Sequence, residues 1–105
     1  DIGPEGLRAL VNSKTLKKVK SLNLYRNCIK DEGAIIFANE NQLEKVEDLD
    51  LAQNEIGDDG ILAISQSKKL PELVSIALDN NFSSAEGKEE AKLGPNFKKL
   101  QSLNL

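Results

Sequence analysis

The sequence predicts an α/β solenoid: a right-handed superhelix of about four 27-residue strand–helix units, with a parallel sheet on the concave face and helices on the convex face. Three observations support this prediction. An asparagine recurs every 27 residues, at Asn27, Asn54 and Asn81. An apolar column recurs at the same spacing, at Leu22, Leu49, Ile76 and Leu103. A glycine column follows it, at Gly6, Gly33, Gly60 and Gly87.

The segment 43–64 shows why each element should form. Leu49 and Leu51 alternate with polar residues, and this period of two is typical of a half-buried strand. The segment 57–60 then reads as a turn and a helix start, and Ile61 and Ile64 follow at helical spacing. The same pattern along the chain predicts helices near 5–13, 32–41, 59–68 and 86–93. It predicts strands near 21–25, 48–52, 75–79 and 102–105.

The first and last helices have special features. Pro4 lies near the first position of the first helix, where a missing N–H costs nothing. In the fourth unit charged residues replace apolar residues of the earlier helices, namely Lys88, Glu89, Glu90 and Lys92. Gly94-Pro95 must end the helix. Ser83 replaces the isoleucine of the earlier units, and we expect Phe82 to fill the resulting gap. This unit is either a weakened terminal repeat or a local insertion that a partner recognises.

The asparagine column has a physical role in this fold. After each strand the backbone turns sharply and directs N–H and C=O groups into the core. A buried asparagine has both a donor and an acceptor to satisfy them. We therefore predict that Asn27, Asn54 and Asn81 form a structural ladder of amides. Asn81-Phe82-Ser83 also matches the glycosylation sequon, but a buried amide could not carry a glycan.

These residues resemble a known repeat family. The pattern Leu43-x-x-Val46-x-x-Leu49-x-Leu51-x-x-Asn54-x-Ile56 resembles the leucine-rich repeat. The segment 29–34, Ile-Lys-Asp-Glu-Gly-Ala, is similar to the helix opening of the ribonuclease-inhibitor-like class. That class includes the Ran GTPase-activating protein and the receptor ends of NOD-like proteins. The resemblance covers nearly the whole chain and implies the fold, but the class serves many functions.

The length of 105 residues suits one domain, residues 1–105, with repeat units 2–28, 29–55, 56–82 and 83–105. The chain begins with Asp1 and has no convincing polar capping repeat, so we expect a fragment of a longer array. Uncapped ends leave a strand edge without a partner, and such an edge favours self-association of the chain through the ends of the solenoid.

The composition argues against several functions. The absence of histidine and the single Cys28 exclude Ser/His and Cys/His nucleophile pairs and a zinc site, so we expect no catalysis, metal or cofactor. The net charge of -3 and the lack of aromatic residues among the lysines argue against nucleic acid. No apolar run is long enough to span a membrane. One unpaired cysteine indicates a reducing, cytoplasmic location.

The remaining candidate is a surface. Alternate residues of each strand should face the concavity, and the next residues should form its rim. The predicted partner-binding residues are Ser21, Asn23, Tyr25, Arg26, Asp48, Asp50, Gln53, Asp79 and Asn80. The same face includes Ala52, Ser75, Ala77, Ser102 and Asn104. Tyrosine and arginine are common at binding hot spots, although Tyr25 and Arg26 also fit an ordinary variable surface.

Three functions remain open at this point. The first is a protein–protein interaction module that binds a partner through the concave face. The second, implied by the resemblance to the Ran regulator, is a GTPase-activating protein with Arg26 at the rim, although the acidic tail common in that family is absent here. The third is a structural spacer. A GTP hydrolysis assay with and without the chain would separate the first two.

Charges are also divided between two edges of the predicted solenoid. Acidic residues gather at the helix starts: Glu5, Asp31, Glu32, Asp58, Asp59 and Glu86. Lysines gather after the helices: Lys14, Lys17, Lys18, Lys45, Lys68, Lys69, Lys98 and Lys99. Either the edges dock a charged partner, or the charges only complement the helix dipoles, which is the interpretation favoured by the sequence.

Overall fold

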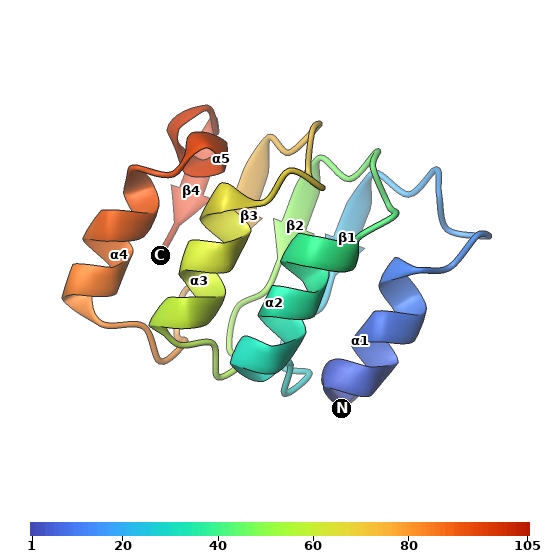
Figure 1. Cartoon of the computed structure of the whole chain (residues 1–105), viewed down its shortest axis with the longest axis horizontal. Coiled ribbons are helices and arrows are strands. Elements are labelled where there is room, and N and C mark those ends of the chain that lie inside the picture. The colour runs from blue at the N-terminus through green and yellow to red at the C-terminus, as the bar shows by residue number, and fades with distance from the viewer.

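The computed structural model describes residues 1–105 and shows a sheet of four parallel strands in the order β1-β2-β3-β4 (Figure 1). The strands are β1 Ser21–Asn23, β2 Asp48–Asp50, β3 Ser75–Ala77 and β4 Ser102–Asn104. Each pairs with the next in register, so that Leu22, Leu49, Ile76 and Leu103 are direct neighbours across the sheet. The register reproduces the 27-residue period seen in the sequence.

A layer of helices covers one face of the sheet, side by side in chain order (Figure 1). The main helices are α1 Gly3–Val11, α2 Lys30–Glu40, α3 Asp58–Gln66 and α4 Ala85–Lys92. A short helix, α5 Pro95–Lys98, lies in the last return segment. This alternation of strands and helices confirms the predicted α/β solenoid of about four repeats.

The elements differ from the predicted ranges in three ways. The four main helices begin and end one or two residues earlier than predicted. The first three strands end two residues before their predicted ends, and β4 ends one residue before. At the ends of β1 and β2 the side chains of Asn23 and Asp50 accept from the N–H groups two residues later, which starts a turn. The backbone then enters the left-handed region at Arg26, Gln53 and Asn80, with φ of 57°, 54° and 59°. This conformation cannot continue a strand. The helix α5 was not predicted. Pro95 ends α4 as expected, but its fixed φ also suits the first turn of a new helix.

The core lies between the sheet and the helices. Leu51 and Ile56 are fully buried there, together with Phe37 of α2 and Ile64 of α3. Leu22 is only partly buried because no further strand covers the outer side of β1. The middle units are thus packed on both sides and the outer units on one side only, as expected for a stack in which each unit contacts its neighbours.

The asparagines of the 27-residue column connect successive units. The Oδ1 of Asn54 accepts hydrogen bonds from the N–H groups of Asn27 (2.9 Å) and Ile29 (3.3 Å). Its Nδ2 donates to the carbonyls of Leu24 (2.8 Å) and Ala52 (3.1 Å). One side chain therefore bonds to the turn and the strand end of the preceding unit as well as to its own turn.

The same arrangement recurs at Asn81, and only partly at Asn27. The Oδ1 of Asn81 accepts from the N–H of Asn54 (2.8 Å) and of Ile56 (3.0 Å), and its Nδ2 donates to two carbonyls. Asn27 makes two bonds, accepting from Ile2 N–H (3.2 Å) and donating to the carbonyl of Tyr25 (3.1 Å). Asn27 therefore forms hydrogen bonds with fewer backbone groups than Asn54 or Asn81 does.

Aspartates of one unit cap the helix of the next. The Oδ1 of Asp31 accepts from the N–H groups of Gly57 (2.6 Å) and Gly60 (3.1 Å), at the start of α3. Asp58, which is 27 residues later, accepts from the Ser84 N–H (2.7 Å) and hydroxyl (2.6 Å), at the start of α4. These bonds from Ser84 lower the pKa of Asp58, because they stabilise the ionised carboxylate.

The expectation that Phe82 fills a gap in the fourth unit is wrong. Its side chain is 70% exposed. The N–H of Phe82 donates to the carbonyl of Ile56 (2.8 Å), and the Ser83 hydroxyl donates to the same carbonyl (3.1 Å). Because Ser83 makes this bond to the neighbouring unit, the backbone needs no apolar anchor here and Phe82 points outward.

Candidate functional site

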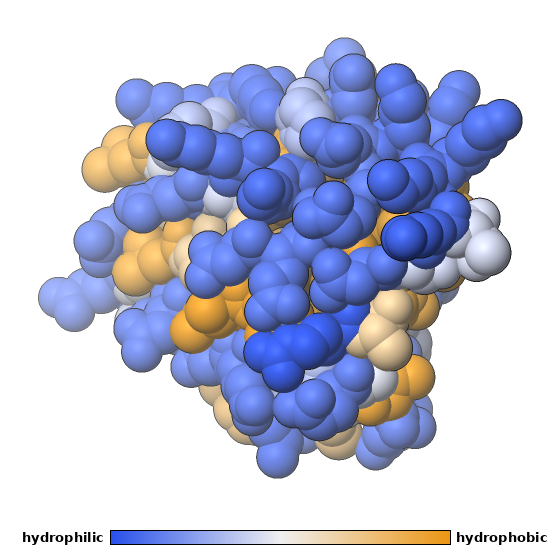
Figure 2. All heavy atoms as spheres, turned by 45° about the vertical axis from the view of Figure 1, so that its right-hand side comes forward, coloured by the Kyte–Doolittle hydropathy of each residue, from blue (hydrophilic) through white to orange (hydrophobic).

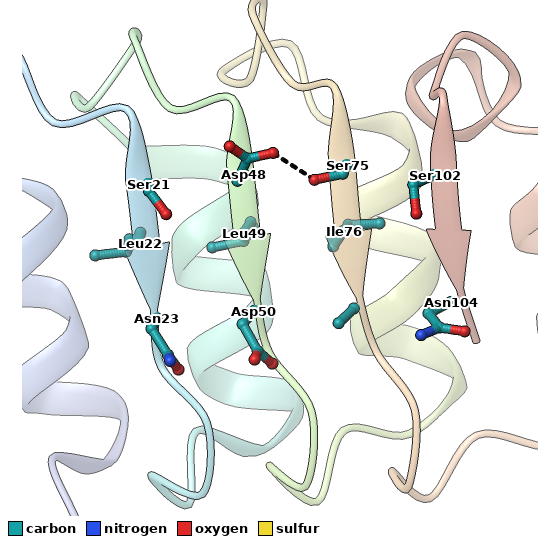
Figure 3. A pocket seen from close by; sticks show the side chains of 11 residues that line it. Ser21, Leu22, Asn23, Asp48, Leu49, Asp50, Ser75, Ile76, Ser102 and Asn104 are labelled. Atoms are coloured by element: carbon teal, nitrogen blue, oxygen red, sulfur yellow. Dashed lines mark hydrogen bonds between the residues drawn. The ribbon is translucent and has the colours of Figure 1, made fainter.

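The face of the sheet opposite the helices carries two rows of side chains (Figure 3). The first row is Ser21, Asp48, Ser75 and Ser102. The second row is Asn23, Asp50, Ala77 and Asn104. Leu49 and Ile76, in the middle of their strands, are buried, so alternation along each strand separates the core from this open face.

The two rows line a hollow of about 300 Å³. Its charged groups are the carboxylates of Asp48 and Asp50, and no lysine or arginine lines it. The remaining polar groups are serine hydroxyls and asparagine amides. The hollow is therefore a shallow, polar and negatively charged depression across all four strands.

Internal hydrogen bonds orient several of these side chains. The hydroxyl of Ser75 donates to the Oδ1 of Asp48 at 2.6 Å (Figure 3). The Oδ1 of Asp50 accepts from the N–H of Ala52 at 3.0 Å, two residues further along the chain. Each aspartate thus has one oxygen engaged within the protein and a second that can accept a hydrogen bond from outside. Asn23 makes the same local bond as Asp50, to the N–H of Tyr25 (3.0 Å).

The predicted site residues fall into two groups. One group lines the hollow: Ser21, Asn23, Asp48 and Asp50. The other lies in the turns beyond the strand ends: Tyr25, Arg26, Gln53, Asp79 and Asn80. The Tyr25 side chain is 44% exposed, and the Asn80 amide donates to the Asp79 carboxylate at 3.2 Å. The turn group borders the hollow along one edge and does not line it.

The other residues expected on the concave face fall into two groups, those that line the hollow and one that is buried. Ser75, Ala77, Ser102 and Asn104 line the hollow. The sequence placed them on this face without including them among the binding residues. The repeat itself could have identified them as site residues, because Ser102-Leu103-Asn104 has the same sequence as Ser21-Leu22-Asn23. Ala52 is buried instead, in the segment that follows β2.

Chemical groups outside this face are sparse. Histidine, cysteine and carboxylate side chains form no cluster of three that could hold a metal ion. The Cys28 thiol is partly exposed and donates a hydrogen bond to the Asp1 carboxylate at 3.2 Å. The nearby Glu55 carboxylate raises the pKa of the thiol, because it disfavours the negatively charged thiolate. The neutral thiol is thereby favoured over the reactive thiolate. No helix is both long and apolar enough to cross a membrane.

Comparison with known families agrees with this geometry. A family model described as leucine-rich repeat matches residues 15–38 and 42–65. The fold is a leucine-rich repeat solenoid. Each matched stretch contains one strand of the sheet and most of the helix that follows, first β1 and α2, then β2 and α3. No curated protein matches the sequence. Leucine-rich repeats are in general protein-interaction modules, which directs attention to the open face of the sheet.

Proposed function

We propose that this leucine-rich repeat solenoid is a protein–protein interaction module that binds a partner protein through the open face of its sheet. The observation that carries the proposal is the hollow that extends across all four strands. It is lined by small polar side chains, and no part of the chain covers it (Figure 3). A broad, shallow surface of this kind suits another protein better than a small molecule, which needs an enclosed pocket.

The chemistry of the hollow supports the same proposal. Asp48 and Asp50 each offer a carboxylate oxygen without a bond inside the protein. Small neighbours such as Ser75 and Ala77 let a partner backbone approach closely. Tyr25 and Arg26, at the bordering turn, provide the residue types that contribute most at interfaces. We therefore propose a contact centred on the hollow and extending to this turn.

A finer class assignment rests on the helices. We propose that the solenoid belongs to the ribonuclease-inhibitor-like class, which includes the Ran GTPase-activating protein. The segment 29–34 supports this assignment, and so do the complete helices α2 and α3, of 11 and 9 residues, on the outer face. Such helices keep neighbouring units wide apart on the outside, which leaves the sheet on the inside of the curve.

The test compares matched variants in partner capture from a cell extract. Ser21→Trp and Asp48→Lys place a bulky group or a reversed charge in the hollow, and both positions are exposed. Ala9→Trp, at an exposed position of α1, is the control for added bulk. The proposal expects the hollow variants to lose the bound protein and the control to keep it. Equal recovery by all variants would remove the hollow as the site.

A second comparison addresses the turn. The double variant Tyr25→Ala/Arg26→Ala should weaken recovery of the same partner without altering the thermal melt, because both side chains are exposed. Unchanged recovery would restrict the contact to the hollow.

A further inference from the structure

The return segments that lead from each helix to the next strand form one edge of the solenoid, at the top of Figure 1. We call the segments 12–20, 41–47, 67–74 and 93–101 the basic edge. They contain nine lysines: Lys14, Lys17, Lys18, Lys20, Lys45, Lys68, Lys69, Lys98 and Lys99. They contain three acidic residues: Glu44, Glu47 and Glu72. Along the same edge, the spheres of Figure 2 are mainly hydrophilic.

Helix dipoles do not account for this charge. A cation stabilises a helix C-terminus only within about the last turn, and the last turns of α2 and α3 contain no basic residue. Among the nine lysines only Lys98 lies in such a turn, that of α5. The ion pairs of the protein involve Arg8 and Lys92, which lie outside the basic edge. The acidic half of the helix-dipole interpretation agrees with the structure, because each of the four main helices has an acidic residue in its first turn. The interpretation does not extend to the lysines of the basic edge. None of them forms an ion pair within the protein, and Lys99 donates a long hydrogen bond of 3.5 Å to the carbonyl of Pro71.

Part of the basic edge is hollowed. Two depressions, of about 390 Å³ and about 340 Å³, share Gln66, Ser67 and Lys68 and therefore adjoin one another. Lys69 lines the first, and Lys99 lines the second. Neither depression is lined by a carboxylate. Together they form a basic groove with uncharged hydrogen-bonding groups between the lysines.

The backbone of this groove is fixed from both sides. The Nδ2 of Asn41 donates to the carbonyl of Lys69 at 3.0 Å, and the Nδ2 of Asn96 donates to the carbonyl of Ser67 at 2.7 Å. These amides are almost fully buried, with 1% and 5% of Asn41 and Asn96 exposed. The Ser67 hydroxyl also accepts from the N–H of Lys69 at 3.0 Å. A groove that is ordered in advance loses less entropy when it binds.

We propose that the basic groove binds an acidic, Asp/Glu-rich peptide segment of a partner protein. Carboxylates of the segment would pair with Lys68, Lys69 and Lys99, and its main chain would bond to the amide of Gln66. This surface is separate from the hollow of the sheet, so the two could be occupied together. A segment in the groove adds charge-dependent attraction, which speeds association and selects partners.

The surroundings favour a peptide over a nucleic acid. No aromatic side chain lines either depression, so bases would have nothing to stack on. The acidic residues Glu44 and Glu47 interrupt the lysines on the side toward β1, which limits the continuous track that a polyphosphate backbone needs. The net charge of -3 also opposes a long polyanion.

The experiment measures fluorescence anisotropy of a labelled ten-residue polyglutamate peptide titrated with the full chain. We expect saturable binding that weakens by about tenfold in Lys68→Glu/Lys69→Glu, because close charge pairs would become repulsive. The control Lys30→Glu/Lys88→Glu makes the same change in net charge outside the groove and should stay within about twofold of wild type. A circular dichroism melt of each variant establishes that it is folded.

Each outcome decides the proposal. Saturable binding lost only in the groove variant, and weakened by added salt, supports it. No binding by the wild type, or equal loss in both double variants, overturns it, since a general charge effect would then suffice. A labelled single-stranded oligonucleotide of equal charge is the second probe. If that oligonucleotide binds more tightly than the peptide and through the same lysines, the peptide assignment is overturned in favour of nucleic acid.

Discussion

Replacing Asn54 tests how far the asparagine column holds the solenoid together. The residue is fully buried, and its side chain serves four backbone groups. Asn54→Leu keeps the same number and branching of heavy atoms but removes every one of these hydrogen bonds. We therefore expect a loss of stability that comes from unsatisfied backbone groups and not from a cavity.

The magnitude follows from what each backbone group retains. The carbonyl of Ala52 keeps a second hydrogen bond, from the N–H of Arg26 at 3.2 Å, so it loses little. The N–H of Ile29 and the carbonyl of Leu24 belong to buried residues and depend on Asn54. Each buried group left unpaired costs about 1–3 kcal/mol. Because the surrounding backbone can relax a little, we expect the free energy of unfolding to fall by about 3 kcal/mol in total. For a chain of this size that lowers the melting temperature by on the order of 15 °C.

The assay is urea denaturation followed by circular dichroism, which yields the free energy of unfolding. Asn39→Ala, at an exposed position of α2, is the control and should change stability by less than about 0.5 kcal/mol. Asn27→Leu should cost less than Asn54→Leu, because its side chain makes two hydrogen bonds in place of four. If Asn54→Leu were as stable as the control, or if the two column variants lost equal stability, the role assigned to these amides would be refuted.

Two further predictions concern the contacts between units. Gly60→Ala should lower the free energy of unfolding by about 2 kcal/mol, as overpacking does. The added Cβ would lie 2.6 Å from the Asp31 carboxylate and 2.5 Å from the Ile56 side chain. Urea denaturation would measure this change, and an unchanged midpoint would contradict the prediction. Asp58→Asn should lose stability at neutral pH, as the Ser84 bonds lower the pKa of Asp58 in the folded state. This contribution is present above the ordinary pKa of 3.8 and disappears as the pH falls through it to the lower folded value. Thermal melts from about pH 7 to about pH 2 should therefore converge for wild type and variant, and a constant difference would contradict the assignment.

The candidate site was predictable where the repeat alone defines it. Alternation along the strands identified Ser21, Asn23, Asp48 and Asp50, and all four line the hollow. The ends of the strands were not predictable in this way. Left-handed backbone after a strand usually signals glycine, but here it falls on Arg26 and its counterparts, which carry no such signal. Tyr25 and Asp79 therefore border the hollow in turns, although the sequence placed them inside it.

The fourth unit also could not be predicted fully from the repeat. Its sequence departs from the repeat, so the environments of Phe82 and Asn96 could not be read from earlier units. Phe82 points outward because Ser83 bonds to Ile56 in the neighbouring unit. Asn96 lies in an extra helix and holds the backbone of Ser67, which supports the basic groove. Both outcomes depend on contacts across units that no local pattern encodes.

The amino-acid sequence by itself determined the period, and with it the architecture and the strand register. A strict repeat places each column of residues in the same environment, so one unit predicts the others. Only the tertiary structure decided which carboxylates cap a neighbouring helix, where the strands end and which lysines surround a groove. Those features depend on side chains from different units meeting at distances of a few ångströms. A period defines which residues are equivalent, but not which atoms come into contact.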